Sequence, residues 1–162
     1  MYKFRTMTEE LRDALGNPVP NSERCTALGT ILRRFSIDEI PQLWNVLRGD
    51  MSLIGPRPLL ASYLPRYNAF QRRRHAMRPG LSGLAQVSGR NTLTWEDKFR
   101  LDVLYVDSWS LLLDFRIALK TLRILWSGQG ASDRSTPAEI EFAGSSRPVS
   151  SVDPISVIAH SN

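Results

Sequence analysis

The chain has 162 residues, 42% of them hydrophobic and 23% charged, which is the composition of a globular domain with a core of its own. Its formal net charge of +5 favours an anionic partner: a nucleic acid, a phosphorylated small molecule or an anionic membrane surface. The single cysteine, Cys25, excludes an intramolecular disulfide and any multi-cysteine zinc site, and no apolar run is long enough to span a bilayer.

The first 35 residues predict a short strand, a loop and a short helix. Residues 1–7 alternate apolar and polar side chains, as a strand does. Residues 16–21 are rich in Gly, Pro and Asn and predict a loop. Residues 26–35 predict a helix with Arg33 and Arg34 at its end, close in sequence to an acidic pair. The side chains of this helix expected to face the core are Leu28, Ile31 and Leu32.

Residues 36–47 predict the helix that carries the chemistry. Ser36 and Glu39 have the spacing of a capping box, and Asp38 and Glu39 fall in the first turn. Pro41 cannot donate a backbone hydrogen bond, so we expect that turn to be bent or loosened. The two acids are either a catalytic carboxylate pair or the common acidic first turn that complements a helix dipole. The stripe expected to face the core, with Asp38 clear of it, is Ile37, Ile40, Leu43, Trp44 and Leu47.

A short strand is predicted over residues 51–54, and it leads into the sequence Gly-Pro-Arg-Pro at 55–58. Pro56 and Pro58 restrict the backbone on both sides of Arg57. A guanidinium held this way can meet a carboxylate or phosphate without further ordering cost. A rigid turn with an incidental arginine is the alternative.

Residues 59–77 predict a helix that is broken or bent at Pro65. Its basic run, Arg72–Arg74, is either a solvated face or a contact for phosphates or lipid headgroups. Residues 78–83 predict a tight loop.

Two longer helices follow. Residues 94–105 predict a helix capped by Thr94, in which Asp102 is either a satisfied helix acid or a carboxylate that supports the site. Residues 110–126 predict an amphipathic helix that either packs on a core or lies on a membrane surface. Its basic stripe consists of Arg116, Lys120 and Arg123.

These elements together predict an α+β domain, predominantly helical with a few short strands, over residues 1–130. Residues 131–162 are rich in Ser and Pro with little periodicity, and they predict a tail that is mobile for most of its length.

The residue runs at 3–7, 36–58 and 78–91, continued at 101–106 and 113–114, resemble the bacterial sugar transferases. These are the polyprenyl-phosphate phosphoglycosyl transferases of the monotopic superfamily, and the small single-domain members are the most similar. The resemblance implies a catalytic domain at a membrane surface. It also implies transfer of a sugar 1-phosphate from a UDP-sugar to a polyprenyl (undecaprenyl) phosphate, which gives polyprenyl diphosphate sugar and UMP.

The resemblance also implies roles for individual residues. Asp38 is expected to be the nucleophile that forms a covalent aspartyl-phosphosugar intermediate, and Glu39, together with Asp38, is expected to bind the required Mg²⁺. Substrate phosphates are expected to contact Arg57, Arg33 and Lys3. The supporting residues are expected to be Pro56, Pro58, Gln86, Arg90 and Asp102.

The family places such a protein at the cytoplasmic face of the bacterial inner membrane, in the first membrane step of exopolysaccharide, lipopolysaccharide or other glycoconjugate synthesis. A homodimer is a further candidate assembly. Family members carry a re-entrant membrane helix before the motif at 3–7, and we expect that segment to be missing here. One alternative is therefore a catalytically inactive, membrane-peripheral interaction domain. A basic nucleic-acid-binding module is less favoured, because no recognised reading motif is present and acids lie beside the cations.

Overall fold

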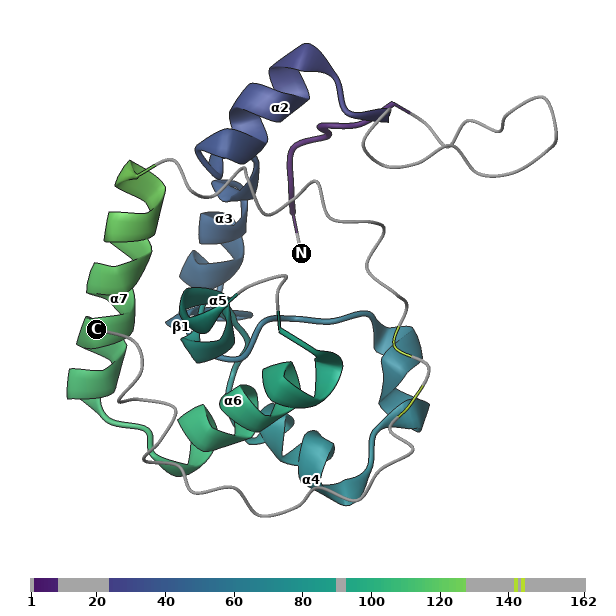
Figure 1. Cartoon of the computed structure of the whole chain (residues 1–162), viewed down its shortest axis with the longest axis vertical. Helices are drawn as coiled ribbons and strands as arrows, with labels where there is room; N and C mark the ends of the chain where they lie inside the picture. Colours follow the sequence, from purple (N-terminus) through teal and green to yellow (C-terminus); the bar gives the residue numbers. More distant parts are fainter. Residues whose placement is uncertain (1, 9–23, 90–92, 128–141, 143, 145–162) are drawn as a thin grey trace, which may run out of the picture.

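A computed structural model of the chain describes residues 2–8, 24–89, 93–127, 142 and 144 (Figure 1). Most of these residues are helical, and two short strands form a small parallel sheet. The fold is therefore α+β, as expected. The elements in chain order are α2 (Ala27–Arg34), the 3₁₀ turn η1 (Ile37–Glu39), α3 (Gln42–Leu47), β1 (Ser52–Ile54), η2 (Ala61–Arg66), α4 (Ala69–Arg72), η3 (Arg73–Ala76), β2 (Gly80–Ser82), α5 (Leu84–Ser88), α6 (Trp95–Asp107) and α7 (Leu111–Trp126).

The sheet is two short parallel strands, β1 and β2, in which Ser52 pairs with Gly80 and Ile54 with Ser82. The strand predicted over 51–54 is confirmed, whereas β2 was predicted only as a tight loop. Glycine is required at the start of β2, because a side chain at Gly80 would collide with the backbone of Gly55. This close approach fixes the segment that follows β1 against β2.

The extended N-terminal segment, residues 2–8, forms an isolated antiparallel bridge between Met7 and Cys25 instead of the predicted strand. It runs beside α2, where a side chain at Gly29 would collide with the carbonyl of Thr6. The loop predicted at 16–21 lies outside the described residues.

Several predicted helix starts are confirmed by side-chain caps. Thr26 accepts from the amide of Gly29 at the start of α2, and Thr94 accepts from the amide of Asp97 at the start of α6. The hydroxyl of Ser110 caps α7 in the same way. Residues 59–77 are more broken than predicted: they form η2, α4 and η3, and Pro65 lies inside η2.

An aromatic cluster packs η2 and the residue after it against α6. It includes Phe142, which is only 2% exposed although it belongs to the segment predicted as a mobile tail. The Phe142 ring lies 5.0 Å from that of Phe99, and Arg66 donates a hydrogen bond to the Phe142 carbonyl. Most of residues 131–162 lie outside the described residues. The other members of the cluster are Tyr63, Tyr67, Phe99 and Trp95.

A second group of apolar side chains faces outward on α2, α3 and α7. Leu28 and Ile31 of α2, which were predicted to face the core, are 67% and 54% exposed. On α7, Ile117 is buried, but the basic stripe and most of the apolar positions are exposed. In the described residues no helix is long and apolar enough to cross a membrane. The outward apolar residues of α7 are Leu111, Leu112, Phe115, Leu119, Leu122 and Trp126.

The buried ring of Phe142 makes a stability prediction. Phe142→Ala should lower the free energy of unfolding by about 3–5 kcal/mol, because it opens a cavity among four packed aromatic rings. Phe115→Ala is the matched control, since that ring is 60% exposed, and it should change stability by less than about 0.5 kcal/mol. Denaturant unfolding curves measure both. Equal effects would show that the 142 segment does not pack into the core in solution.

Candidate active site

The acidic pair lies on η1, a single 3₁₀ turn between α2 and α3. Ser36, just before it, has a left-handed backbone (φ 54°), and its side chain does not cap the turn, so the capping-box prediction is wrong. The expected break at Pro41 is confirmed, because the regular helix α3 begins only at Gln42. The left-handed backbone at Ser36 and the break at Pro41 together separate the turn that carries Asp38 and Glu39 from α2 and α3.

The orientation of this region is the reverse of the predicted one. The Asp38 side chain is completely buried, and Gln42 and Asn45 are each 4% exposed. Trp44 and Leu47, predicted to face the core, are instead 58% and 79% exposed. The polar face of η1 and α3 therefore points into the protein. Ile40 and Leu43 are exposed with them.

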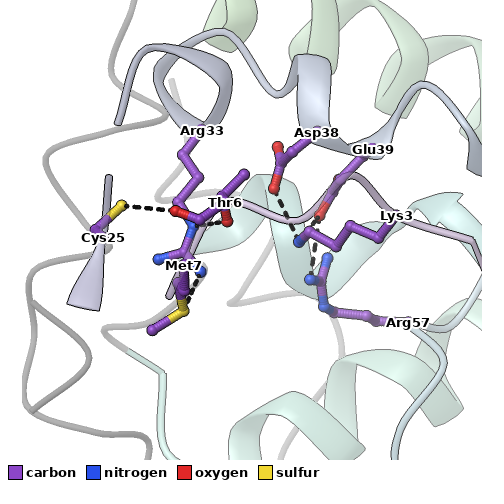
Figure 2. Close-up of polar contacts among 8 residues, drawn as sticks. All are labelled: Lys3, Thr6, Met7, Cys25, Arg33, Asp38, Glu39 and Arg57. Carbon is purple, nitrogen blue, oxygen red and sulfur yellow. Dashed lines mark hydrogen bonds and ion pairs between the residues drawn. The ribbon is translucent and has the colours of Figure 1, made fainter. Parts of the chain in front are cut away.

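Two cations from distant segments meet the carboxylates (Figure 2). The Lys3 Nζ lies 3.1 Å from Asp38 Oδ2 and 3.4 Å from Glu39 Oε1. Arg57 Nη2 lies 3.3 Å from the same Glu39 oxygen. The N-terminal segment is tied to this turn by a backbone hydrogen bond of 3.0 Å from the Phe4 amide to the Asp38 carbonyl. The structure thus brings together Asp38, Glu39, Lys3 and Arg57, four of the residues that the family resemblance assigned to the site.

Arg33 lies close by but makes a different set of contacts. Its Nε donates to Thr6 Oγ1 at 2.9 Å, and its Nη2 lies 2.9 Å from Met7 Sδ (Figure 2). Arg33 therefore fastens the extended segment that carries Lys3. Its expected phosphate contact stays a prediction.

Arg57 is supported from behind by a buried ion pair. Pro56 is buried, Pro58 is half-buried, and the guanidinium of Arg74 donates to the Arg57 carbonyl and to Asp102 Oδ2. Burial raises the pKa of the Asp102 carboxyl, and the adjacent Arg74 guanidinium opposes that rise. Asp102 is thus satisfied by Arg74 and reaches Arg57 only through it, so its expected supporting role stays a prediction. Sequence reasoning missed Arg74, because it stood inside a run of basic residues.

That run is not one basic face. Arg74 is 3% exposed, so its prediction as part of a solvated or lipid-facing surface is wrong. Arg73 pairs with Asp107 on α6, and Arg72 donates to the carbonyl of Tyr67 at 3.2 Å. Only part of the charge of this segment is therefore available to an anionic partner.

Gln86 lies on α5 beside the backbone of Gly55, since a side chain at Gly83 would collide with both of them. Its carboxamide nitrogen and oxygen are buried and have no hydrogen-bond partner among the described residues. Gln86 thus lies next to the start of the Pro-Arg-Pro segment, and its expected role in supporting that segment stays a prediction. Arg90 lies outside the described residues.

The pair Asp38 and Glu39 is the candidate metal site. No group of three or more His, Cys, Asp or Glu side chains within the described ranges could hold a metal ion. Two carboxylates completed by substrate phosphates and water are a donor set typical of Mg²⁺. The residues present therefore fit this cation.

The comparison with known proteins identifies the family of the chain. The bacterial sugar transferase family matches residues 1–128, and the chain belongs to that family. The enzyme class predicted from the sequence, the phosphoglycosyl transferases, is confirmed by relatives that are named as sugar phosphotransferases. The matched residues include the acidic pair, the Pro-Arg-Pro segment and the helices around them.

Three relatives illustrate the likeness. The uncharacterized sugar transferase EpsL of Bacillus subtilis is 51% identical over 90% of this chain and 71% of its own length. The undecaprenyl-phosphate galactose phosphotransferase of Salmonella typhimurium is 40% identical over 80% of this chain. A UDP-N-acetylgalactosamine-undecaprenyl-phosphate N-acetylgalactosaminephosphotransferase of Aeromonas hydrophila is 38% identical over 81%. The chain spans 31% and 33% of the lengths of these last two.

The reversed orientation of α3 can be tested with one charge placed on either face. Asn45→Lys should lower the free energy of unfolding by about 3 kcal/mol or more, because it buries an unpaired charge. Leu47→Lys is the matched control on the exposed face, and it should change stability by less than about 0.5 kcal/mol. Thermal or denaturant unfolding measures both. The opposite ranking would restore the orientation predicted from the sequence.

Proposed function

We propose that this chain transfers a sugar 1-phosphate from a UDP-sugar to a polyprenyl phosphate by way of a covalent intermediate on Asp38. The observation that carries the proposal is the buried Asp38 carboxylate, with Glu39 beside it and Lys3 within 3.1 Å. A carboxylate among fixed cations can attack a phosphorus atom whose oxygens those cations neutralise. The names of the relatives supply the substrate classes.

In the first step an Asp38 oxygen attacks the phosphorus that bears the sugar. A new carboxylate oxygen–phosphorus bond forms, and the bond from that phosphorus to the bridging oxygen breaks. The electron pair of the broken bond leaves on UMP. In the second step a phosphate oxygen of the polyprenyl phosphate attacks the same phosphorus, and the Asp38 carboxylate leaves unchanged. One exchange is thereby divided into two displacements.

The surrounding cations have separate tasks in this scheme. Lys3 holds the Asp38 carboxylate in the absence of substrate, and it is close enough to meet a phosphate oxygen that displaces it. Arg57 contacts Glu39 from the other side and presents a planar fork that suits two phosphate oxygens. Both cations thus neutralise charge on a bound diphosphate.

Glu39 and Asp38 would hold Mg²⁺. When bound, this cation withdraws charge from the phosphate oxygens and orients the leaving group. Glu39 is 13% exposed, so it can turn toward a ligand that enters from solvent.

We further propose that the outward apolar side chains of α2, α3 and α7 rest on a membrane. Large exposed apolar side chains on three helices are typical of an interaction site, and a polyprenyl phosphate presents its phosphate at the headgroup layer. A groove of about 580 Å³ opens between α3, β1 and α7, and its lining includes Val46, Leu53 and Phe115. Lys120 and Arg123 lie on the same helix, where anionic headgroups would meet them.

The covalent step predicts what Asp38→Asn does. This variant should lose transfer activity by at least about 1,000-fold, because an amide is a poor nucleophile toward phosphorus. The unchanged chain, given UDP-sugar and Mg²⁺ without lipid, should release UMP up to one equivalent per chain and then stop. Quenched-flow UMP measurement and intact-protein mass spectrometry check both results.

Asp107→Asn is the matched control for this test, since Asp107 is exposed and pairs only with Arg73 among the contacts described. It should keep full activity. Transfer by Asp38→Asn at more than a few per cent of the normal rate would remove Asp38 as the nucleophile.

The membrane proposal predicts the effect of polar substitutions on α7. The chain should float with vesicles that contain anionic lipid, and part of this binding should survive high salt, because apolar contacts are not screened. Leu119→Gln with Leu122→Gln should weaken binding by about 2 kcal/mol or more, since two exposed leucines lose their burial in the bilayer.

Leu60→Gln with Leu64→Gln is the matched control. These leucines lie on or beside η2, away from α7 (Figure 1), and their exposures of 63% and 49% match the 63% and 50% of Leu122 and Leu119. The control should float as the unchanged chain does. Equal loss in both pairs would show that α7 is not the membrane face.

A further inference from the structure

The backbone on either side of Arg57 has an unusual shortage of hydrogen-bond donors. Pro56 and Pro58 have no N–H group, so this segment is anchored mainly through its carbonyl oxygens. The Pro56 carbonyl accepts from the amide of Gly80 at 3.0 Å, which ties it to β2. The Arg57 carbonyl, one residue further, accepts from the Nη2 of Arg74. The backbone of Arg57 is therefore held in place by the side chain of a second arginine.

Arg74 is itself held rigidly. Its side chain is 2% exposed, and its Nε and Nη2 lie 2.9 Å and 2.6 Å from the same oxygen of Asp102 on α6. The guanidinium lies 5.7 Å from the centre of the Phe99 ring, in the aromatic cluster. Nη2 is thus shared between Asp102 and the Arg57 carbonyl. A continuous set of contacts runs from α6 through Arg74 to Arg57.

A stabilising role alone does not explain this arrangement. A well-packed apolar pair of similar volume often supplies as much stability as a buried ion pair. What an apolar pair cannot supply is a directed donor to the Arg57 carbonyl. The neighbouring pair, Arg73 with Asp107, joins the same two elements, η3 and α6, and is about half exposed.

We propose that Arg74 is a positioning residue for Arg57: anchored by Asp102, it fixes the backbone from which the Arg57 guanidinium reaches the acidic pair. The inference deepens the proposed function. Only its effect on transfer kinetics depends on that function. The mobility of the Arg57 side chain can be measured in the chain itself, without substrate.

The test replaces both charges at once, because removal of one alone would leave a buried charge unpaired. Arg74→Met with Asp102→Leu removes the donor and fills the space. Arg73→Met with Asp107→Leu is the matched control, with the same substitutions on the same two elements. Asp102→Asn is a milder variant that keeps the side-chain shape and one acceptor, and it replaces the double variant if circular dichroism shows that the latter does not fold.

The first readout is ¹⁵N relaxation of the Arg57 Nε–Hε group, assigned by its loss in Arg57→Lys. We expect a lower order parameter for Arg57 in the Arg74→Met, Asp102→Leu variant, a smaller decrease in Asp102→Asn, and no change in the control. The second readout is steady-state transfer. There kcat/KM should fall by about 10–100-fold, mostly in kcat, because a misplaced cation fails to meet charge that develops in the transition state.

A third measurement separates positioning from general stabilisation. In an Arg57→Lys background the same double replacement should lower kcat/KM by less than about threefold, since no planar fork is left to position. An equal factor in both backgrounds, or an Arg57 Nε–Hε group as ordered as in the unchanged chain, would overturn the inference. An unchanged chain without transfer activity would contradict the proposed function instead, and the relaxation readout would still decide the role of Arg74.

Discussion

The burial of the Asp38 carboxylate is the constraint on which the rest of this structure depends. A carboxylate removed from water costs several kcal/mol unless opposite charge and hydrogen bonds offset the loss. Lys3 supplies that charge from 35 positions earlier in the chain. The extended segment that carries Lys3 is fastened at the Asp38 carbonyl and by Arg33 at Thr6. A buried acid thus determines the course of a segment that has no regular structure of its own.

The same constraint explains the outward apolar side chains. An α-helix can turn one face inward, and in α3 the inward face is the polar one, with Gln42 and Asn45 beside the acidic turn. Its apolar face is then left on the surface, where water makes it unfavourable. Burial of that face against another apolar phase would remove the cost. Under the proposed function, the acidic turn has to meet a lipid phosphate, and α3 has to cover its apolar face. A membrane surface beside α3 would satisfy both requirements.

The sequence predicted three helix starts correctly and the orientation of two helices wrongly. Helix starts at Thr26, Thr94 and Ser110 depend on a hydroxyl and a nearby amide, and they were found. Periodicity divides a helix into two faces but does not say which is inside, and the usual assumption of an apolar interior failed at α2 and α3. β2 was missed because three residues that include a glycine carry little strand signal. Phe142 was missed because the composition around it is that of a disordered segment.

The candidate site was predicted as far as local sequence motifs allow. Asp38 with Glu39, and Arg57 between two prolines, are each visible in a few consecutive residues. That Lys3 lies against the acids, and that Arg74 lies behind Arg57, follows only from tertiary contacts over 35 and 17 positions. The two cations also differ in support: Lys3 is carried by an extended segment, whereas Arg57 is tied through Arg74 and Asp102 to the well-packed helix α6. Under the proposed function, Lys3 would move with the entering substrate while Arg57 kept its place, and one site would combine an adaptable charge with a fixed one.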